Sequence, residues 1–286
     1  GPAGGAILAT SIADDLNLNK VISFDMGGTT AKITIIENKK AIKAREFEVD
    51  RKARFKKGSG LPLRIPVIEM VEIGAGGGSI ARVNKLEQII TGPDSAGSFP
   101  GPACYDNGGE RPTITDADLV IGKINPDNFA GGKISLSKDL ANKAIKKNIS
   151  EIVKMDNETA ALAISEIVDE TMSNAARVHT VEQGHETSNR TLIAFGGAAP
   201  LHIARVAEKL RVNSVIIPTN ASVGSAVGFL KSPVGYEVVK SLRMLLNVFQ
   251  AEKVNELLKK MRNEAEKIIQ NTSGKVSFVE ERYAFM

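Results

Sequence analysis

The sequence predicts an α/β protein with a mixed sheet flanked by helices. Within residues 21–36, a glycine turn joins two apolar, β-branched runs, a pattern typical of adjacent antiparallel strands. Residues 191–218 show the order strand, glycine turn, helix, strand, which is typical of a parallel strand pair. Amphipathic helical patterns occupy most of the second half. Both pairing types, together with these helices, favour a mixed sheet covered by helices.

The composition argues against several classes of protein. The 286 residues are 42% hydrophobic and 24% charged, as in globular chains, and no apolar run approaches the ~20 residues of a membrane helix. We therefore expect a soluble protein without a membrane segment. The net charge of +4 comes from dispersed lysines without interleaved stacking aromatics, which argues against a nucleic-acid partner. A single cysteine and no visible secretion signal favour a reducing, cytoplasmic location.

Periodicity predicts the first elements in order. Residues 6–18 carry apolar side chains near helical spacing. The two strands of residues 21–36 follow, and alternation predicts a third antiparallel strand over residues 41–49. Residues 51–60 are basic and contain glycines, so we expect a loop there.

The turn between the first two strands is a candidate phosphate site. Gly27 and Gly28 allow backbone amides to approach an anion, and Thr29 and Thr30 add hydroxyl donors. Asp25 at the strand end is placed to hold a hydrated magnesium ion or to orient a water molecule. A buried strand acid followed by an ordinary glycine hairpin would give the same short pattern, so both interpretations stay open.

The stretch from residue 51 to about residue 132 is predicted to be a glycine- and proline-rich insertion. Its turn formers are too dense for a regular layer, although residues 65–73 and 88–91 are candidate strands. Long loops without secondary structure of their own are uncommon in compact domains unless they are functional. This favours an active-site or subunit-contact segment over an irregular surface excursion.

Three polar side chains and one thiol in this insertion are candidate site residues. Thr115 is the predicted N-cap of a short helix. Asp116 and Asp118 are spaced for a metal ion or for capping, and capping is favoured. Cys104 is interpreted as a buried structural thiol because no base lies near it in the sequence.

Two helices are predicted after the insertion, over residues 137–153 and 156–183. The second carries one apolar stripe and begins at a cap formed by Asp156 or Asn157. His179 lies close to that stripe, which favours a core or interface histidine over a catalytic one.

The second glycine turn lies in the unit of residues 191–218. Gly196 and Gly197 form the turn, and Pro200 lies near the first turn of the following helix. Small residues at a helix N-terminus let the base or phosphate of a ligand approach the backbone. His202 either contacts such a ligand or packs in the interior, and the sequence leaves both open.

The remaining residues predict a C-terminal region distinct from the first domain. We assign residues 1–235 to the first domain and residues 236–286 to the start of a truncated C-terminal region. The elements predicted from residue 221 on are a small-residue helix over 221–229, a strand over 236–248, an amphipathic helix over 254–269 and a strand over 276–285. Because the chain opens on GPAGG without a methionine, we expect a domain fragment.

Five longer motifs are distinctive. They are FDMGGTTAK at residues 24–32, EIGAGGGSIA at 72–81, GPDSAGSFPGPACY at 92–105, PTITDADLVIG at 112–122 and AFGGAAPLH at 194–202. In this order they resemble the hydantoinase A and 5-oxoprolinase family, which includes N-methylhydantoinase A subunits and the β subunits of acetone and acetophenone carboxylases. The resemblance runs through nearly the whole chain. It implies an actin-like ATPase lobe of the ribonuclease-H type.

The resemblance also implies an ATP site that uses Mg²⁺. The residues corresponding to the second phosphate motif are Asp25, Gly27, Gly28, Thr29 and Thr30, and those corresponding to the adenosine motif are Gly196, Gly197 and Pro200. Family members usually carry an additional N-terminal lobe and work with a hydantoinase B-type companion subunit. This chain is therefore expected to supply one half of the ATP site. Many relatives have aspartate at the position of Lys32. The lysine therefore favours the carboxylase-like branch of the family and argues against a hydantoin substrate.

The activity implied by the resemblance is ATP-dependent opening of a cyclic amide, or ATP-dependent carboxylation of a ketone with bicarbonate. Positioning and charge stabilisation would be the protein's main roles, as in phosphoryl transfer generally. A sugar or acid kinase is one alternative, although we would not expect it to carry GPDSAGSFPGPACY. A non-catalytic nucleotide-dependent chaperone or reactivating factor is another, since one fold serves many functions.

Overall fold

The computed structural model describes residues 1–44, 47–50, 52, 58–63 and 67–273. The chain divides into two compact units, Gly1–Lys231 and Ser232–Met286. The first unit contains the large sheet and both glycine turns. Among the described helices, none combines the length and the apolar character needed to span a bilayer.

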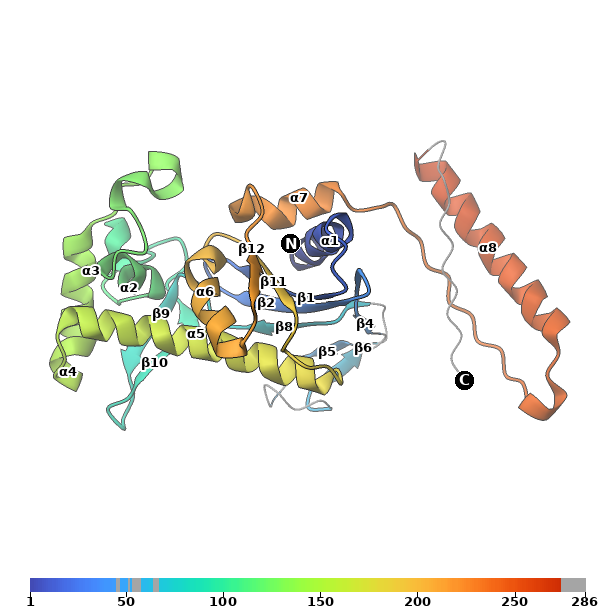
Figure 1. Ribbon diagram of the computed structural model, residues 1–286, viewed down its shortest axis with the longest axis horizontal. Coiled ribbons are helices and arrows are strands. Elements are labelled where there is room, and N and C mark those ends of the chain that lie inside the picture. The colour runs from blue at the N-terminus through green and yellow to red at the C-terminus, as the bar shows by residue number, and fades with distance from the viewer. Residues whose placement is uncertain (45–46, 51, 53–57, 64–66, 274–286) are drawn as a thin grey trace. The chain divides into compact units, whose positions relative to one another are not determined.

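The first unit is built on a mixed sheet, as the sequence predicts (Figure 1). Across the described sheet the strands are β12 (Ser214–Ile216), β11 (Thr191–Phe195), β1 (Lys20–Met26), β2 (Ala31–Glu37) and β3 (Lys40–Ala41), with β8 (Met70–Ile73) also paired to β2. β1 is antiparallel to β2, because a tight turn joins them, and parallel to β11. β12 pairs in parallel with β11, which confirms the predicted strand–helix–strand unit.

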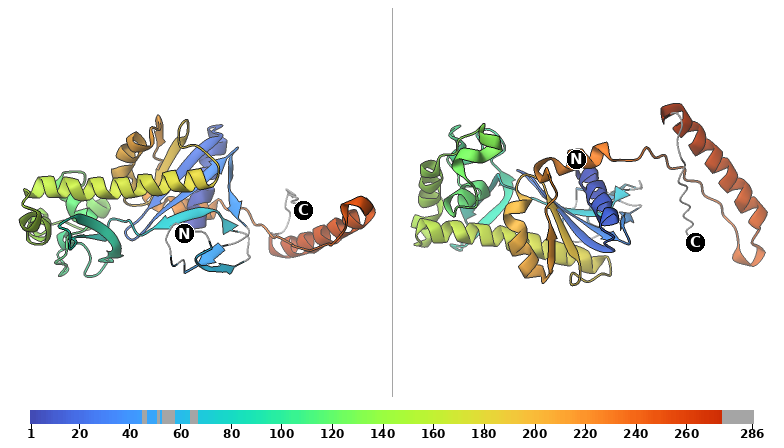
Figure 2. Two further views of the ribbon diagram at one scale, coloured as in Figure 1. Left: turned by 90° about the horizontal axis from the view of Figure 1, so that it is seen from below. Right: turned by 45° about the horizontal axis from the view of Figure 1, so that its top comes forward.

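Helices cover both faces of this sheet (Figure 1 and Figure 2). α1 (Pro2–Asp15) and α7 (Gly224–Leu230) lie on one face, and α5 (Asn157–Glu182) and α6 (Ala199–Leu210) lie on the other. Because side chains alternate along a strand, successive residues of β1 belong to two separate apolar cores. The unit is therefore a three-layer α/β/α arrangement.

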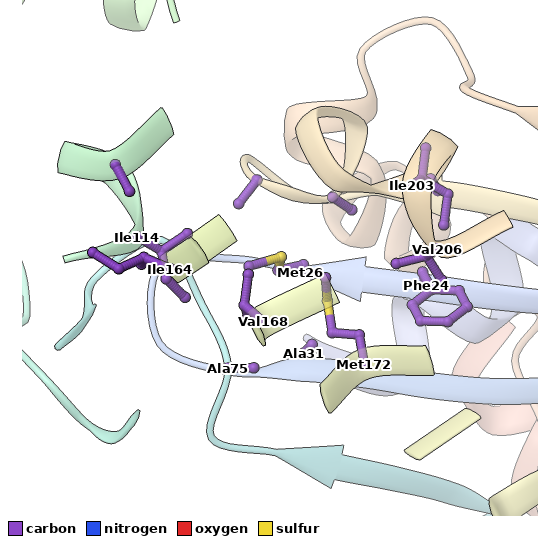
Figure 3. Packing of buried hydrophobic residues seen from close by; sticks show 14 of the residues in the cluster. Phe24, Met26, Ala31, Ala75, Ile114, Ile164, Val168, Met172, Ile203 and Val206 are labelled. Atoms are coloured by element: carbon purple, nitrogen blue, oxygen red, sulfur yellow. The ribbon is translucent and has the colours of Figure 1, made fainter. Parts of the chain in front are cut away.

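The larger core lies between the sheet and α5 and α6 (Figure 3). Phe24 and Met26 of β1 belong to the same cluster as Val168 and Met172 of α5 and Ile203 of α6. These five side chains are at most 2% exposed. Burying a side chain of this size stabilises the fold by about 1.5–3 kcal/mol. The core therefore fixes α5 and α6 against the end of β1, where Asp25 lies.

The predicted insertion contains a hairpin, β9 (Ser79–Val83) and β10 (Ile89–Ser95), and the short helix α2 (Ile114–Val120). After it come α3 (Lys138–Ile145), a π-helical turn (Lys146–Ser150) and α4 (Glu151–Val153). The helix predicted over residues 137–153 is thus present, with a π-helical turn in its middle. The helix predicted over residues 156–183 is α5, and the Asp156 carboxylate caps it by accepting from Thr159 N at 2.9 Å.

The strand predicted over residues 41–49 is wrong as a single strand. Its described residues belong to β3, to β4 (Lys43–Ala44) and to β5 (Phe47–Val49). β4 pairs with β7 (Val67–Ile68) and β5 with β6 (Leu61–Leu63), each as a separate two-stranded ladder. Alternation predicts an extended chain but does not specify its partner. The loop predicted over residues 51–60 lies largely outside the described residues, as do residues 65 and 66 of the candidate strand over 65–73.

The second unit contains one long helix among its described residues, α8 (Ala251–Ser273), which confirms the helix predicted over residues 254–269. The strand predicted over residues 236–248 is wrong. Its described residues are irregular and end in a 3-10 turn at Leu246–Val248. Since no other strand occurs in the described part of this unit, no ladder partner is available for an extended segment. The strand predicted over residues 276–285 lies outside the described residues.

Candidate functional site

The predicted phosphate turn, Gly27–Thr30, lies at the edge of the sheet where β1 ends. Gly27 N donates to Thr30 O at 3.2 Å, which closes the turn. Gly28 and Thr29 are exposed, and a Cβ placed on either glycine would meet no heavy atom within 4 Å. The side chain of Asp25, just before the turn, is half-buried. The turn therefore presents its backbone to open space beside a carboxylate.

The second glycine turn lies at the same edge, because β1 and β11 are parallel and both turns follow the strand ends. Gly196 has a φ of +94°, and a Cβ there would lie 2.8 Å from Asp25 Oδ1 and would overlap the Met26 carbonyl oxygen. Glycine is required at this position for both reasons. Ala198 N donates to the same Met26 oxygen at 2.9 Å. The structure thus places the second turn directly against Asp25.

The outer part of the second turn remains accessible. Gly197 is exposed, and a Cβ there would meet no heavy atom within 4 Å. Pro200 is half-buried in the first turn of α6. All the residues predicted for the phosphate and adenosine motifs are therefore brought together at one edge of the sheet.

A third glycine loop, Gly76–Gly78, completes this edge, and the sequence analysis assigned it no role. Gly77 N donates to Gly27 O at 3.1 Å, and Gly78 N donates to Gly28 O at 2.7 Å. A Cβ on Gly76 would lie 2.5 Å from Thr29 N. The three consecutive glycines could have indicated a close backbone contact, but the turn that they contact lies about fifty residues earlier in the chain. The loop therefore supports the predicted phosphate turn through these backbone hydrogen bonds.

Of the two acids of α2, Asp116 has the predicted capping role and Asp118 does not, and the predicted N-cap residue is wrong. The N-cap is Thr113, not Thr115, and it forms a capping box in which Asp116 Oδ2 accepts from Thr113 N at 2.8 Å. Thr115 instead donates its hydroxyl to Gly77 O at 2.9 Å. Asp116 also accepts from Cys104 N at 2.7 Å, so capping is confirmed for this residue. Asp118 caps nothing and points into the interior.

Asp118 belongs to a buried cluster of charges that joins three helices. His202 Nδ1 on α6 lies 2.8 Å from Asp169 Oδ1 on α5, and His202 Nε2 lies 3.0 Å from Asp118 Oδ2 on α2. Lys123 Nζ lies 3.8 Å and 3.9 Å from the same two carboxylates and donates to Ser165 Oγ at 2.8 Å. Burial lowers the pKa of His202, but the two carboxylates outweigh it and raise the pKa to about 9.

This arrangement settles the open question on His202 within the described chain. Its ring is fully buried between two carboxylates, so it packs rather than reaching the open edge of the site. Two positive and two negative groups balance one another, as buried charges require. Asp118 lies one turn after Thr115 and His202 one turn after the start of α6. The cluster therefore fixes the ends of α2 and α6 that contact the glycine loops.

The charge of His202 predicts how stability depends on pH. Its folded pKa of about 9 lies above the ordinary value of 6.5, so the folded state holds the proton more tightly than the unfolded state. This stabilisation is complete below about pH 6.5 and is lost as the pH rises through about 9. We expect the melting temperature to fall over that interval in scanning calorimetry. His202→Gln should lack most of this fall, and an equal fall in both proteins would contradict the assignment.

Two further candidates from the sequence are structural. Cys104 is fully buried, and burial together with the nearby Asp116 carboxylate raises the pKa of its thiol. A protonated, inaccessible thiol is a poor nucleophile, which agrees with the prediction. His179 is 4% exposed, and it lies on the buried side of α5, as expected for a core histidine.

Asp25 has two polar neighbours that the sequence analysis did not connect to it. Ser225 of α7 donates its hydroxyl to Asp25 Oδ2 at 2.5 Å. Lys32 lies opposite Asp25 in the β1–β2 ladder, on the same face of the sheet, and its Nζ is 3.6 Å from Glu72 Oε1. Among the described residues, no group of three or more histidine, cysteine, aspartate or glutamate side chains is arranged to hold a metal. Asp25 is thus hydrogen-bonded to one hydroxyl and does not belong to a cluster of metal-ligand side chains within the described residues.

A mixed sheet with helices on both faces and glycine turns at one edge agrees with the class of the actin-like ATPase lobes, and the solved structures to which this chain is similar support that class. The family model described as hydantoinase/oxoprolinase matches residues 1–238. The chain belongs to this family, which confirms the resemblance drawn from the five motifs.

Three similar proteins support the assignment. An uncharacterised protein of Methanocaldococcus jannaschii is 40% identical over 90% of this chain, and caprolactamase subunit alpha of Pseudomonas jessenii is 33% identical over 92%. A solved nucleotide-free structure of acetone carboxylase, described in a study of the mechanism of ATP-dependent acetone carboxylation, is also similar. It matches 95% of this chain with a TM-score of 0.80 and 27% sequence identity. The chain spans 37–38% of the length of these three proteins.

Proposed function

We propose that this chain supplies one half of the ATP site of an enzyme that opens a cyclic amide or carboxylates a ketone with bicarbonate. The observation that carries the proposal is the meeting of three glycine loops around Asp25 at one edge of the sheet. Open backbone amides beside a strand end suit the phosphates of a nucleotide. The relatives support ATP, since one is titled for ATP-dependent acetone carboxylation and another is named for a lactam, which is a cyclic amide.

The residues at this edge fit a magnesium nucleotide. Asp25 offers a half-exposed carboxylate, the hard oxygen ligand that Mg²⁺ prefers. Thr29 and Thr30 would donate their hydroxyls to phosphate oxygens, and the surface beside Gly197 leaves room for the nucleoside. Magnesium, when bound, neutralises charge on the phosphates. The chain's own residues would hold the phosphates in line and orient the groups around them.

We propose that a further lobe and a hydantoinase B-type companion subunit complete the site. The relatives are about 2.6 times as long as the matched segment, and one is named as a subunit. Lys32 favours the carboxylase-like branch because many relatives have aspartate at this position; it lies opposite Asp25 in the β1–β2 ladder, with its Nζ 3.6 Å from Glu72 Oε1. A need for ATP supports a cytoplasmic location.

Calorimetric titration with Mg-ATP and Mg-ADP tests the proposal. We expect weak binding by this chain, in the millimolar range typical of half a site, and at least tenfold weaker binding by Asp25→Asn, since one charge-assisted contact is worth about 1.4 kcal/mol or more. Binding by the wild type should require magnesium. Asp15→Asn, an exposed acid at the far end of α1, is the matched control and should bind as the wild type does.

Three results would argue for other functions. If the wild type binds no nucleotide, the glycine loops are structural hairpins, whereas equal binding by Asp25→Asn would remove only the role given to Asp25. If a sugar or carboxylic acid is phosphorylated, a kinase is the better assignment. If the chain binds nucleotide but no cyclic amide or ketone stimulates ATP hydrolysis, even with the companion subunit present, a nucleotide-dependent chaperone is favoured.

A further inference from the structure

Ser225 is the residue that fixes the orientation of the Asp25 carboxylate. Its Oγ donates to Asp25 Oδ2 at 2.5 Å, although the two residues are 200 positions apart. Helical hydroxyls usually bond back to the carbonyl four residues earlier, and Thr10, Thr171, Ser173 and Thr180 all do so here. Ser225 does not follow this pattern: the carbonyl oxygen four residues earlier, that of Ala221, accepts from Gly196 N at 2.7 Å, and the Ser225 hydroxyl donates to Asp25 instead.

The 3-10 turn Ala221–Val223 and the start of α7, which follows it directly, are thus bonded to both parts of the candidate site. Ala221 holds the backbone of the second glycine turn, and Ser225, one turn later, holds the carboxylate that precedes the first. α1 keeps Ser225 in place from the other side. A Cβ on Gly4 would overlap the Ser225 carbonyl oxygen, and a Cβ on Gly5 would lie 3.1 Å from Asp25 Oδ2.

The bond selects one orientation of a group that otherwise rotates. The terminal torsion of aspartate is broad, so a carboxylate at a strand end samples many orientations unless it is held. Here Oδ2 is occupied by Ser225, and Oδ1 lies toward the Gly196 turn. We propose that Ser225 is a positioning residue: it holds Asp25 in the orientation that receives magnesium and thereby sets the magnesium dependence of nucleotide binding. This inference rests on the proposed function.

A double-mutant cycle on this chain tests the proposal, with Mg-ADP as the probe and calorimetry as the readout. Outer partners of metal-binding carboxylates are typically worth about 10- to 100-fold in metal affinity. We therefore expect Ser225→Ala to raise the magnesium concentration for half-maximal binding about tenfold and to leave magnesium-free ADP binding unchanged. In the Asp25→Asn background, the same substitution should have no further effect. Ser222→Ala, an exposed serine three residues earlier, should behave as the wild type.

The outcomes separate this inference from the proposed function. If Asp25→Asn weakens binding and Ser225→Ala does not, the positioning role is wrong and the nucleotide site stands. An equal effect of Ser225→Ala in both backgrounds, or an equal loss with and without magnesium, would make Ser225 merely structural and also overturn the inference. If the wild type binds no nucleotide, both the inference and the proposed function fail. If Asp25→Asn binds as well as the wild type and with the same magnesium dependence, the inference fails and the nucleotide site stands without Asp25. Thermal melts of the unliganded variants show whether each one is folded.

Discussion

Replacing His202 with alanine is expected to lower the free energy of unfolding by about 3–5 kcal/mol, the usual cost of removing one partner from a buried ion pair. Asp118 and Asp169 are each 1% exposed, and His202 is the cation closest to both. Without it, two carboxylates share the single ammonium of Lys123 at 3.8–3.9 Å. Urea unfolding of the two proteins measures the difference.

His185→Ala is the control for the loss of a histidine. Its ring is 32% exposed and lies 3.4 Å from Glu37, so its removal should change stability by less than about 1 kcal/mol. His202→Gln keeps a donor in the cluster and should fall between the two, which provides a measurable variant if His202→Ala does not fold. A loss of less than about 1 kcal/mol in His202→Ala would mean that the ionic description of this cluster is wrong.

Local sequence patterns were sufficient for the elements that surround Asp25. The β1–β2 hairpin and the β11–α6–β12 unit follow from β-branched runs separated by glycine, and such signals act over a few residues. The parallel pairing of β1 with β11, which brings the two glycine turns to one edge, was not predicted from these patterns; only the family resemblance assigned both turns to one site. The broken strand over residues 41–49 shows the limit: its partners come from residues 61–68, which alternation does not identify.

The cap of α2 shows why local patterns leave some roles undecided. Thr113 and Thr115 are each followed three residues later by an aspartate, so the sequence contains two overlapping capping boxes. Tertiary contacts choose between them. Asp118 is drawn inward by His202 and Lys123, whereas Asp116 is left to cap the helix and to bind Cys104 N. Lys123 follows α2 closely in the sequence, but His202 is 84 residues from Asp118, and no local pattern indicates that the two side chains meet.

The parts of the candidate site that were missed all depend on distant segments. Gly77 contacts Gly27 across 50 residues, and Ser225 contacts Asp25 across 200. Asp169 did leave a signal, since an acid within an apolar helical stripe requires a buried partner. The stripe does not say which side chain that partner is. Periodicity specifies which face is buried, while the identity of a polar partner comes only from the packed structure.

The second large effect is expected for Gly228→Ala, which should destabilise the chain by about 1–3 kcal/mol. Helix propensity alone predicts the opposite sign, a gain of about 1 kcal/mol for alanine over glycine inside a helix. The steric term wins because the new Cβ would overlap the Gly4 carbonyl oxygen and lie 2.9 Å from Leu8 N. Both are backbone atoms of α1, so a change of side-chain rotamer cannot relieve the overlap. Gly235→Ala is the control, since a Cβ there would meet no heavy atom within 4 Å.

Combining Gly228→Ala with Gly4→Ala distinguishes a helix displacement from two independent clashes. A Cβ on Gly4 would overlap the Ser225 carbonyl oxygen, so each substitution alone should push α1 and α7 apart along the same direction. Once one substitution has separated the helices, the second methyl group meets less steric overlap. The loss of unfolding free energy in the double variant should therefore be smaller than the sum of the two single losses. The same displacement would carry Ser225 away from Asp25, so magnesium-dependent ADP binding should weaken in each single variant. An additive loss with unchanged binding would show that α7 stays in place and that the strain is absorbed elsewhere.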